Sequence, residues 1–266
     1  MRNSPIGIFD SGIGGLTVAN AIKKVLPNEN IIYFGDTEHL PYGEKSQEAI
    51  QNFSKKIIKF LIKEQCKTIV IACNSASSVI ERSITDDVGG PFIFNVIDPV
   101  IEEIIRKNNH YKIGVIGTKA TIDSNIYAKK IKKKSSTITV NSLATPLLAP
   151  MIEEGFINGG ISQTIIANYL SNRKLANIDL LILACTHYPL IQEEIKKYYN
   201  QNINILDSAN IVAKYIAIQL QKNKLLKKSN KTQHDFYVSN YTESFEKSAK
   251  FFFKETIKLE EKKLFS

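Results

Sequence analysis

Residues 68–75 read TIVIACNS, and residues 180–187 read LLILACTH. Each stretch begins with a nearly continuous apolar run and ends in alanine, cysteine and two polar residues. Continuous apolar runs are typical of strands in a parallel sheet, because such a sheet is buried on both faces. The two stretches therefore predict an α/β fold of open, mainly parallel sheets, in which two strands end in polar loops that begin with a cysteine.

Short apolar runs alternate with helical patterns along the rest of the chain, as expected for βαβ units. Asp98-Pro99 signals a helix start, with an N-cap acid and a proline at the first helical position, and Asp207-Ser208 and Ser162 are weaker signals of this kind. The predicted strands are 6–9, 31–34, 68–72, 92–96, 112–116, 137–140, 180–184 and 204–206. The predicted helices are about 15–26, 46–64, 76–84, 99–108, 121–133, 162–173, 189–199 and 208–226.

The chain carries signs of an internal duplication. Residues 6–10 (IGIFD) resemble residues 113–117 (IGVIG), and residues 69–75 (IVIACNS) resemble residues 181–187 (LILACTH), at offsets of 107 and 112 residues. Any two buried strands look alike, but a shared Ala-Cys-polar-polar sequence in both halves is harder to attribute to chance. The pattern predicts two pseudo-symmetric α/β halves.

The charge of the chain raises the question of a nucleic-acid partner, because 35 Lys and Arg outweigh 26 Asp and Glu for a formal net charge of +9. The excess lies in residues 55–67, 129–134 and 222–231, which we interpret as solvated helix faces or the turns after them. Residues 1–54 carry four basic and six acidic side chains. Only 4 of the 35 basic residues are arginine, the residue favoured for phosphate and base contacts. The pattern favours solubility over specific nucleic-acid binding.

The composition also indicates the cellular compartment. Three cysteines in 266 residues do not make a disulfide framework. No apolar run approaches the ~18 residues that span a bilayer, and residues 1–15 meet Asp10 before any long apolar stretch, unlike a secretory signal. We expect a cytoplasmic protein with reduced thiols and no membrane partner.

Four predicted strands end in polar loops, at the edge where open α/β sheets bind ligands. In the first loop, residues 10–17, the glycines allow a tight turn whose N–H groups could cradle a carboxylate. The loop fails the dinucleotide fingerprint, because the third glycine would fall at Thr17. Asp10 beside an anion pocket is suited to bind an ammonium group or to act as a general base. The second loop, residues 35–43, contributes Asp36.

The other two loops carry Cys73 and Cys185, each between a strand and a predicted helix. A helix N-terminus lowers the pKa of a thiol, so the pattern predicts thiolate character at both positions. Cys66 lacks polar neighbours of interest and is interpreted as a small buried residue. Three chemistries could use the pair: a disulfide, a zinc site that includes His187, or two-base proton transfer that inverts a stereocentre. The spacing fits neither a C-x-x-C redox motif nor a usual zinc pattern, which favours the third.

These motifs resemble those of the cofactor-independent aspartate/glutamate racemase family over essentially the whole chain. The resemblance rests on GIFDSGIGGL (7–16), FGD (34–36) followed by PYG (41–43), ACNSAS (72–77), GVIGT (114–118) and CTHYP (185–189). It implies two α/β domains, residues 1–97 with 207–266 and residues 98–206, with the active site between them. It further implies a homodimer that interconverts L- and D-glutamate for peptidoglycan synthesis, without pyridoxal phosphate or a metal.

The resemblance also implies roles for individual residues. Cys73 would deprotonate D-glutamate with help from Asp10, and Cys185 would deprotonate L-glutamate with help from His187, which Glu153 orients. Asp36 is expected just behind the site. Asp10 and His187 would contact the substrate, Asp10 through its ammonium group. The two carboxylates would be held by Ser11, Tyr42, Gly43, Asn74, Ser75, Thr118, Thr121 and Thr186. One position departs from the family, which usually has threonine where this chain has Ser75, so a hydroxyl is kept and a methyl lost.

Two alternatives stay open at this point. The motifs do not measure the depth of the pocket, so a related racemase acting on aspartate or another small amino acid is possible. A basic nucleic-acid-binding α/β protein is an alternative of another class. Turnover of L-glutamate and L-aspartate without a cofactor tests the first, and salt-dependent DNA binding without racemisation would favour the second.

Overall fold

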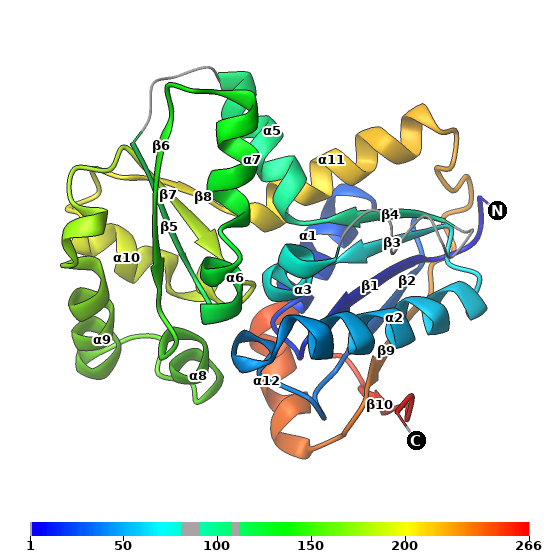
Figure 1. The fold of residues 1–266 in the computed structure, drawn as a ribbon. Coiled ribbons are helices and arrows are strands. Elements are labelled where there is room, and N and C mark those ends of the chain that lie inside the picture. Colours follow the sequence, from blue (N-terminus) through cyan, green and yellow to red (C-terminus); the bar gives the residue numbers. More distant parts are fainter. Residues whose placement is uncertain (1, 81–90, 108–111, 266) are drawn as a thin grey trace.

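The computed structural model describes residues 2–80, 91–107 and 112–265, which form two parallel sheets (Figure 1). The first sheet has the strand order β10-β9-β2-β1-β3-β4, and the second has the order β6-β5-β7-β8. All recorded strand pairs in both sheets are parallel. The predicted fold class is confirmed.

The strands of the first sheet come from both ends of the chain, while those of the second come from its middle. The first sheet contains β1 (Ile6–Asp10), β2 (Ile31–Gly35), β3 (Thr68–Ile71), β4 (Phe92–Asn95), β9 (His234–Val238) and β10 (Glu260–Glu261). The second contains β5 (Lys112–Gly117), β6 (Thr139–Ala144), β7 (Leu180–Ala184) and β8 (Asn204–Leu206). The eight predicted strands are present, and β9 and β10 are additional. The domain boundaries given above stay a prediction.

The two sheets share one strand order, which agrees with the predicted duplication. In β2-β1-β3-β4 and in β6-β5-β7-β8, the first strand of each half lies between the second and the third. Cys73 follows β3 and Cys185 follows β7, so the two cysteines hold equivalent places. The polar loops after these strands are therefore at the carboxyl ends of equivalent strands.

The helices lie between and around the sheets. They are α1 (Leu16–Val25), α2 (Gln47–Lys63), α3 (Asn74–Val79), α5 (Ile97–Lys107), α6 (Lys119–Asp123), α7 (Ile126–Lys134), α8 (Leu148–Glu153), α9 (Gly160–Leu170), α10 (Gln192–Tyr198), α11 (Ser208–Lys222) and α12 (Glu243–Phe253). Within the described residues, short 3-10 helices are η1 (Tyr42–Glu44), η2 (Arg173–Leu175) and η3 (Tyr188–Ile191).

Several helix predictions were wrong in detail. The helix expected at 121–133 is two helices, because Asn125 between them has a left-handed backbone with φ 56°. The start signal at Asp98 was misread, since Asn95 Oδ1 accepts the N–H groups of Ile97 and Asp98 and thereby caps α5. Of the helix expected at 76–84, α3 ends at Val79 and residues 81–84 lie outside the described residues. Asp207 caps α11 as expected, through a hydrogen bond from Ala209 N.

Each face of the first sheet has its own apolar core. Successive residues of β1 alternate between faces, so Ile8 joins the core beneath α1 and α11 while Phe9 joins the core beneath α2. Figure 1 shows α2 in front of this sheet and α1 behind it. The core of α1 and α11 continues into the second sheet, where it includes Ile182 of β7. This shared core fixes the two sheets relative to each other.

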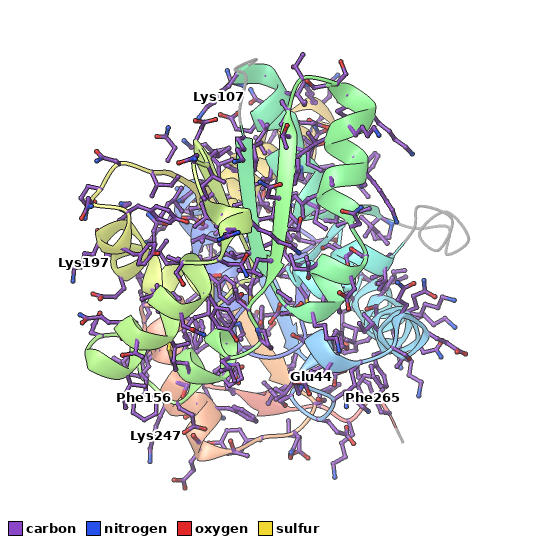
Figure 2. All side chains as sticks on the ribbon, turned by 60° about the vertical axis from the view of Figure 1, so that its left-hand side comes forward. Glu44, Lys107, Phe156, Lys197, Lys247 and Phe265 are labelled. Atoms are coloured by element: carbon purple, nitrogen blue, oxygen red, sulfur yellow. The ribbon has the colours of Figure 1, made fainter. Side chains whose placement is uncertain are left out.

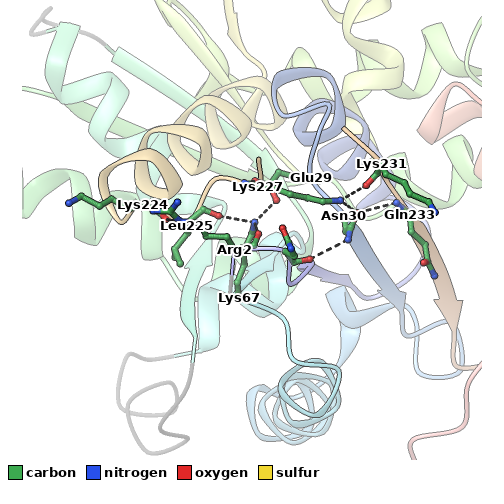
Figure 3. Close-up of polar contacts among 10 residues, drawn as sticks. Arg2, Glu29, Asn30, Lys67, Lys224, Leu225, Lys227, Lys231 and Gln233 are labelled. Atoms are coloured by element: carbon green, nitrogen blue, oxygen red, sulfur yellow. Dashed lines mark hydrogen bonds and ion pairs between the residues drawn. The ribbon is translucent and has the colours of Figure 1, made fainter. Parts of the chain in front are cut away.

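A buried ion pair ties the segment after α11 to the rest of the chain (Figure 3). Lys67 Nζ contacts Glu29 Oε2 and donates to the carbonyls of Arg2 at 2.8 Å and Leu225 at 2.9 Å. Glu29 Oε1 accepts the backbone N–H of Lys227 at 2.8 Å. Burial lowers the pKa of Lys67. Lys67 is only 4% exposed, so the expectation that residues 55–67 form a solvated basic face was wrong at this position.

Other lysines do lie at the surface. Lys197 and Lys247, labelled in Figure 2, are well exposed and pair with Glu194 and Glu243 one turn earlier. Phe156, also labelled there, is 47% exposed in the segment after α8. In the part of the chain that the structure describes, no helix combines the length and hydropathy needed to cross a bilayer.

The buried ion pair leads to a stability prediction. Glu29→Gln should lower the free energy of unfolding by about 3–5 kcal/mol, because it leaves a buried ammonium without its counter-charge. Glu255→Gln is the matched control. The Glu255 side chain, which pairs with Lys23, is 54% exposed, so this replacement should lower the free energy of unfolding by at most about 1 kcal/mol. Urea unfolding at pH 7 measures both, and equal losses would contradict a special role for the buried pair.

Candidate active site

The first half of the site lies where β3 ends. Cys73 is the N-cap of α3, and its Sγ accepts the N–H of Ala76 at 3.5 Å and lies 3.6 Å from Ser11 Oγ. Burial, followed by the nearby charge of Asp10, raises the pKa of Cys73 to about 12. The predicted lowering of this pKa was therefore wrong. The helix is only six residues long, and its few N–H groups do not offset the loss of hydration.

Asp10 ends β1 and is fully buried. Its Oδ2 accepts the N–H of Gly12 at 3.2 Å, and Tyr33 Oη holds the same turn by donating to Gly12 O at 2.8 Å. Burial raises the pKa of Asp10, although His187 and the N–H groups of Gly15 and Gly12 act in the opposite direction. Burial therefore opposes ionisation of both Asp10 and Cys73.

The second half of the site lies where β7 ends. Cys185 Sγ is 3.6 Å from His187 Nδ1, and His187 Nε2 is 2.8 Å from Glu153 Oε1 at the end of α8. Burial alone would lower the pKa of His187. Hydrogen bonds to Cys185 and Glu153 outweigh burial and hold that pKa well above its usual value of 6.5. The imidazole thus joins a thiol to a carboxylate, an arrangement suited to proton transfer at sulfur.

The two halves meet through the loops after β1 and β7. Thr186 Oγ1 donates to Asp10 Oδ1 at 3.5 Å, and Thr17 Oγ1 donates to Thr186 O at 3.1 Å. A Cβ at Gly14 would lie 2.6 Å from Thr186 Oγ1 and 2.5 Å from His187 Nδ1. Only glycine fits at position 14. The carboxyl ends of both sheets therefore face each other, with one cysteine on each side.

Hydroxyl groups gather between the halves. Ser75 Oγ lies 2.8 Å from Thr118 Oγ1, which lies 3.1 Å from Thr121 Oγ1. Beside them Asn74 Oδ1 accepts a hydrogen bond from Tyr127 Oη at 2.8 Å, while Asn74 Nδ2 is buried without a partner. Because buried amides are nearly always paired, this N–H₂ group is a donor available to a bound anion.

The loop after β2 borders the same region. A Cβ at Gly43 would lie 2.7 Å from Thr118 Cβ, which places the backbone of η1 against the start of α6. Tyr42 Oη donates to Asp36 Oδ2 at 2.6 Å, and Ser239 Oγ donates to Asp36 Oδ1 at 2.8 Å. Asp36 therefore holds the Tyr42 side chain, as expected for a group just behind the site.

All the site residues predicted from the sequence thus lie in one contiguous group. The three cysteines are free, and Cys66 is a buried residue apart from the group. Among residues 2–80, 91–107 and 112–265, no cluster of three or more His, Cys, Asp or Glu side chains has the arrangement of a metal site. Neither the disulfide nor the zinc interpretation gains support from these contacts.

Sequence reasoning missed the residues that support the site from a distance. Tyr33 holds the turn at Gly12, Tyr127 holds Asn74, Ser239 holds Asp36, and the ring of Phe252 packs edge to face on His187 with centroids 5.2 Å apart. None of them stands in a motif, and Ser239 and Phe252 belong to a C-terminal segment for which no element was predicted. Their roles depend on tertiary contacts alone.

Comparison with known proteins decides the family. A model of the family described as Asp/Glu/Hydantoin racemase matches residues 16–216, about three quarters of the chain. The chain belongs to this family. Cys73 and Cys185, at the ends of β3 and β7, both lie within the matched residues.

Individual members of the Asp/Glu/Hydantoin racemase family are similar along nearly the whole chain. Glutamate racemase 3 of Caldanaerobacter subterraneus subsp. tengcongensis is 39% identical over 251 residues, which cover 94% of this chain and 91% of that protein. The crystal structure of glutamate racemase from Francisella tularensis in complex with D-glutamate has a TM-score of 0.93 at 39% identity, covering 100% of this chain and 99% of that one. A glutamate racemase isoform from Bacillus anthracis has a TM-score of 0.94 at 34% identity, covering 99% of both chains.

Likeness to proteins named for aspartate is weaker. The crystal structure of an aspartate racemase homologue from Pyrococcus horikoshii has a TM-score of 0.56 at 21% identity, covering 82% of this chain and 99% of that one. At this identity the similarity is one of fold alone.

The buried Asp10 leads to a pH-dependent prediction. The pKa of Asp10 in the folded protein is raised above 3.8. Its contribution to the free energy of unfolding is therefore fully present below pH 3.8 and is lost as the pH rises through the pKa of the folded state. Asp10→Asn should therefore be more stable than the wild type at pH 7. The gain is about 1.4 kcal/mol for each pH unit by which the folded protein raises the pKa of Asp10. The gain should shrink as the pH falls toward 4.

Urea unfolding of both proteins at pH 7 and near pH 4 measures the effect. Asp36→Asn is the control, since this carboxylate accepts two hydroxyl hydrogen bonds and its loss should destabilise the protein. An Asp10→Asn variant that is less stable than the wild type at pH 7 would contradict the burial argument.

Proposed function

We propose that this chain is a glutamate racemase that interconverts L- and D-glutamate by two-base proton transfer at Cα. One observation carries the proposal: two free thiols follow equivalent strands of two sheets whose carboxyl ends face each other. A substrate held between them can lose its Cα proton to one sulfur, and the planar carbanion-like intermediate that results can gain a proton from the other sulfur on the opposite face. The curated relatives and solved structures named for glutamate support glutamate over aspartate.

The substrate would be held largely by neutral donors. Asn74 Nδ2 and the hydroxyls of Ser75, Thr118 and Thr121 suit its two carboxylates, with further contacts from Ser11, Thr186, His187 and the η1 backbone at Tyr42 and Gly43. The ammonium group suits Asp10. A bound ammonium offsets the burial of the Asp10 charge, which favours ionisation of that carboxyl only when substrate is present.

The α-proton beside a carboxylate is weakly acidic, so the site must stabilise an enediolate. Preorganised donors such as Asn74 Nδ2 do this best in a site that excludes water. Cys185, paired with His187 and Glu153, would take the proton from L-glutamate. Cys73, with a pKa of about 12, is a thiol at rest and would deliver the proton to the opposite face. In the reverse direction Cys73 is the base and Asp10 its partner.

Several wider statements belong to this proposal. We propose that the reaction needs neither pyridoxal phosphate nor a metal, and that its D-glutamate supplies peptidoglycan synthesis. We place the enzyme in the cytoplasm, because the chemistry requires reduced thiols. We propose a homodimer on the family resemblance. Nucleic-acid binding has no feature in its favour beyond the net charge.

Single replacements of the cysteines test the mechanism. Cys73→Ser and Cys185→Ser should each lower kcat/KM for both enantiomers by at least about a hundredfold, because a serine hydroxyl is a far weaker acid than a thiol and each direction needs both groups. Cys66→Ser is the matched control and should stay active, since that buried thiol lies apart from the site. Polarimetry or chiral chromatography with L- and D-glutamate, without added cofactor, provides the measurement.

Two outcomes would count against the proposal. Full activity in either Cys73→Ser or Cys185→Ser would falsify the two-base scheme. Wild-type turnover of L-aspartate without turnover of L-glutamate would overturn the choice of substrate and leave the two-thiol geometry in place.

A further inference from the structure

Helix α12 carries three consecutive phenylalanines that lie in different surroundings. Phe251 is 59% exposed, whereas Phe252 and Phe253 are 2% and 1% exposed. Successive side chains of an α-helix point about 100° apart, so the three rings point to three sides of the helix. Replacements at these three positions therefore compare a surface residue, a site residue and a core residue within one turn of the same helix.

Phe253 fixes α12 to the first sheet. Its ring packs against Phe236 of β9 at 4.9 Å between centroids, and Lys23 Nζ of α1 lies 5.4 Å from its centroid. Lys23 also pairs with Glu255 just after the helix, at 2.6 Å. The helix is therefore anchored independently of the site.

Phe252 points instead toward the second half of the site. Its ring packs edge to face on His187, with centroids 5.2 Å apart and planes at 82°. His187 belongs to the loop after β7 in the second sheet, whereas α12 follows β9 of the first. Phe252 also lies outside residues 16–216, the part of the chain that the family model matches. A helix from the C-terminal segment thus completes the surroundings of His187.

The other contacts of His187 leave one motion of its imidazole ring unrestrained. Its two ring nitrogens face Cys185 at 3.6 Å and Glu153 at 2.8 Å. Contacts at the two nitrogens set the direction of the ring, yet the ring can still rock about the axis between them. Gly14 offers only backbone on its side. An aromatic ring packed on the imidazole opposes rocking and keeps water away.

We propose that Phe252 is a positioning residue for His187, holding the imidazole in line with Cys185 so that the proton passes between sulfur and nitrogen. This inference rests on the proposed racemisation. Rocking of the ring would turn the proton or lone pair of Nδ1 away from Cys185 Sγ, which already lies 3.6 Å away, and would interrupt the proton transfer. Phe252 and Cys185 belong to the core beneath α1 and α11, whereas Cys73 belongs to the core beneath α2, so only the Cys185 step should respond.

Isotope effects separate the two steps. The equilibrium constant between enantiomers is unity, so any variant lowers kcat/KM equally in both directions. With glutamate deuterated at Cα, however, the L enantiomer reports C–H cleavage at Cys185 and the D enantiomer reports cleavage at Cys73. Phe252→Leu should lower kcat/KM by about ten- to a hundredfold. Its isotope effect should rise for the L enantiomer and fall for the D enantiomer.

The neighbouring phenylalanines provide the controls. Phe253→Leu should lower the melting temperature at least as much as Phe252→Leu but leave both isotope effects at their wild-type values. Phe251→Leu should change neither quantity. If Phe252→Leu does not fold, Phe252→Met fills a similar volume without a ring and carries the same expectation.

The outcomes distinguish the inference from the proposed function. An active wild type in which the Phe252 variants keep wild-type isotope effects for both enantiomers would overturn the positioning role alone. A wild type that racemises neither glutamate nor aspartate would overturn the proposed function and the inference with it.

Discussion

The contact between the loops after β1 and β7 is the constraint on which the site depends. Thr186 Oγ1 donates to Asp10 Oδ1, Thr17 Oγ1 donates to Thr186 O, and a side chain at Gly14 would overlap Thr186 and His187. The core of α1 and α11 continues into the second sheet and holds the two sheets together beneath these loops. Two sheets with one strand order thereby present equivalent cysteines to a common space.

This closeness has an energetic cost. A carboxyl and a thiol are both buried here, and burial raises the pKa of Asp10 and of Cys73. Asn74 keeps an N–H₂ group buried without a partner. The buried Asp10 carboxyl and the unpartnered Asn74 amide lower the stability of the fold and become favourable when a charged ligand binds, which is the usual relation between stability and function at an active site.

The sequence was sufficient for the fold class and for a set of polar residues that the structure brings together at the candidate site. Continuous apolar runs predicted the buried parallel strands, and the repeated Ala-Cys sequence predicted the equivalent thiols. Local patterns could not predict that β9, five residues long, pairs with β2 some 200 positions earlier, or that α12 brings Phe252 to His187. Nor could they predict the pKa of Cys73, because the loss of hydration depends on the whole surrounding fold.

Early-time NMR of L-glutamate with the wild-type enzyme in D₂O tests the central claim most directly. If each thiol serves one face, the first D-glutamate formed carries deuterium at Cα, because Cys73 delivers a solvent-derived deuteron. The remaining L-glutamate still carries hydrogen at that stage. D-glutamate that retains the substrate proton, or deuterium entering both enantiomers equally from the start, would show that one base serves both faces and would contradict the account.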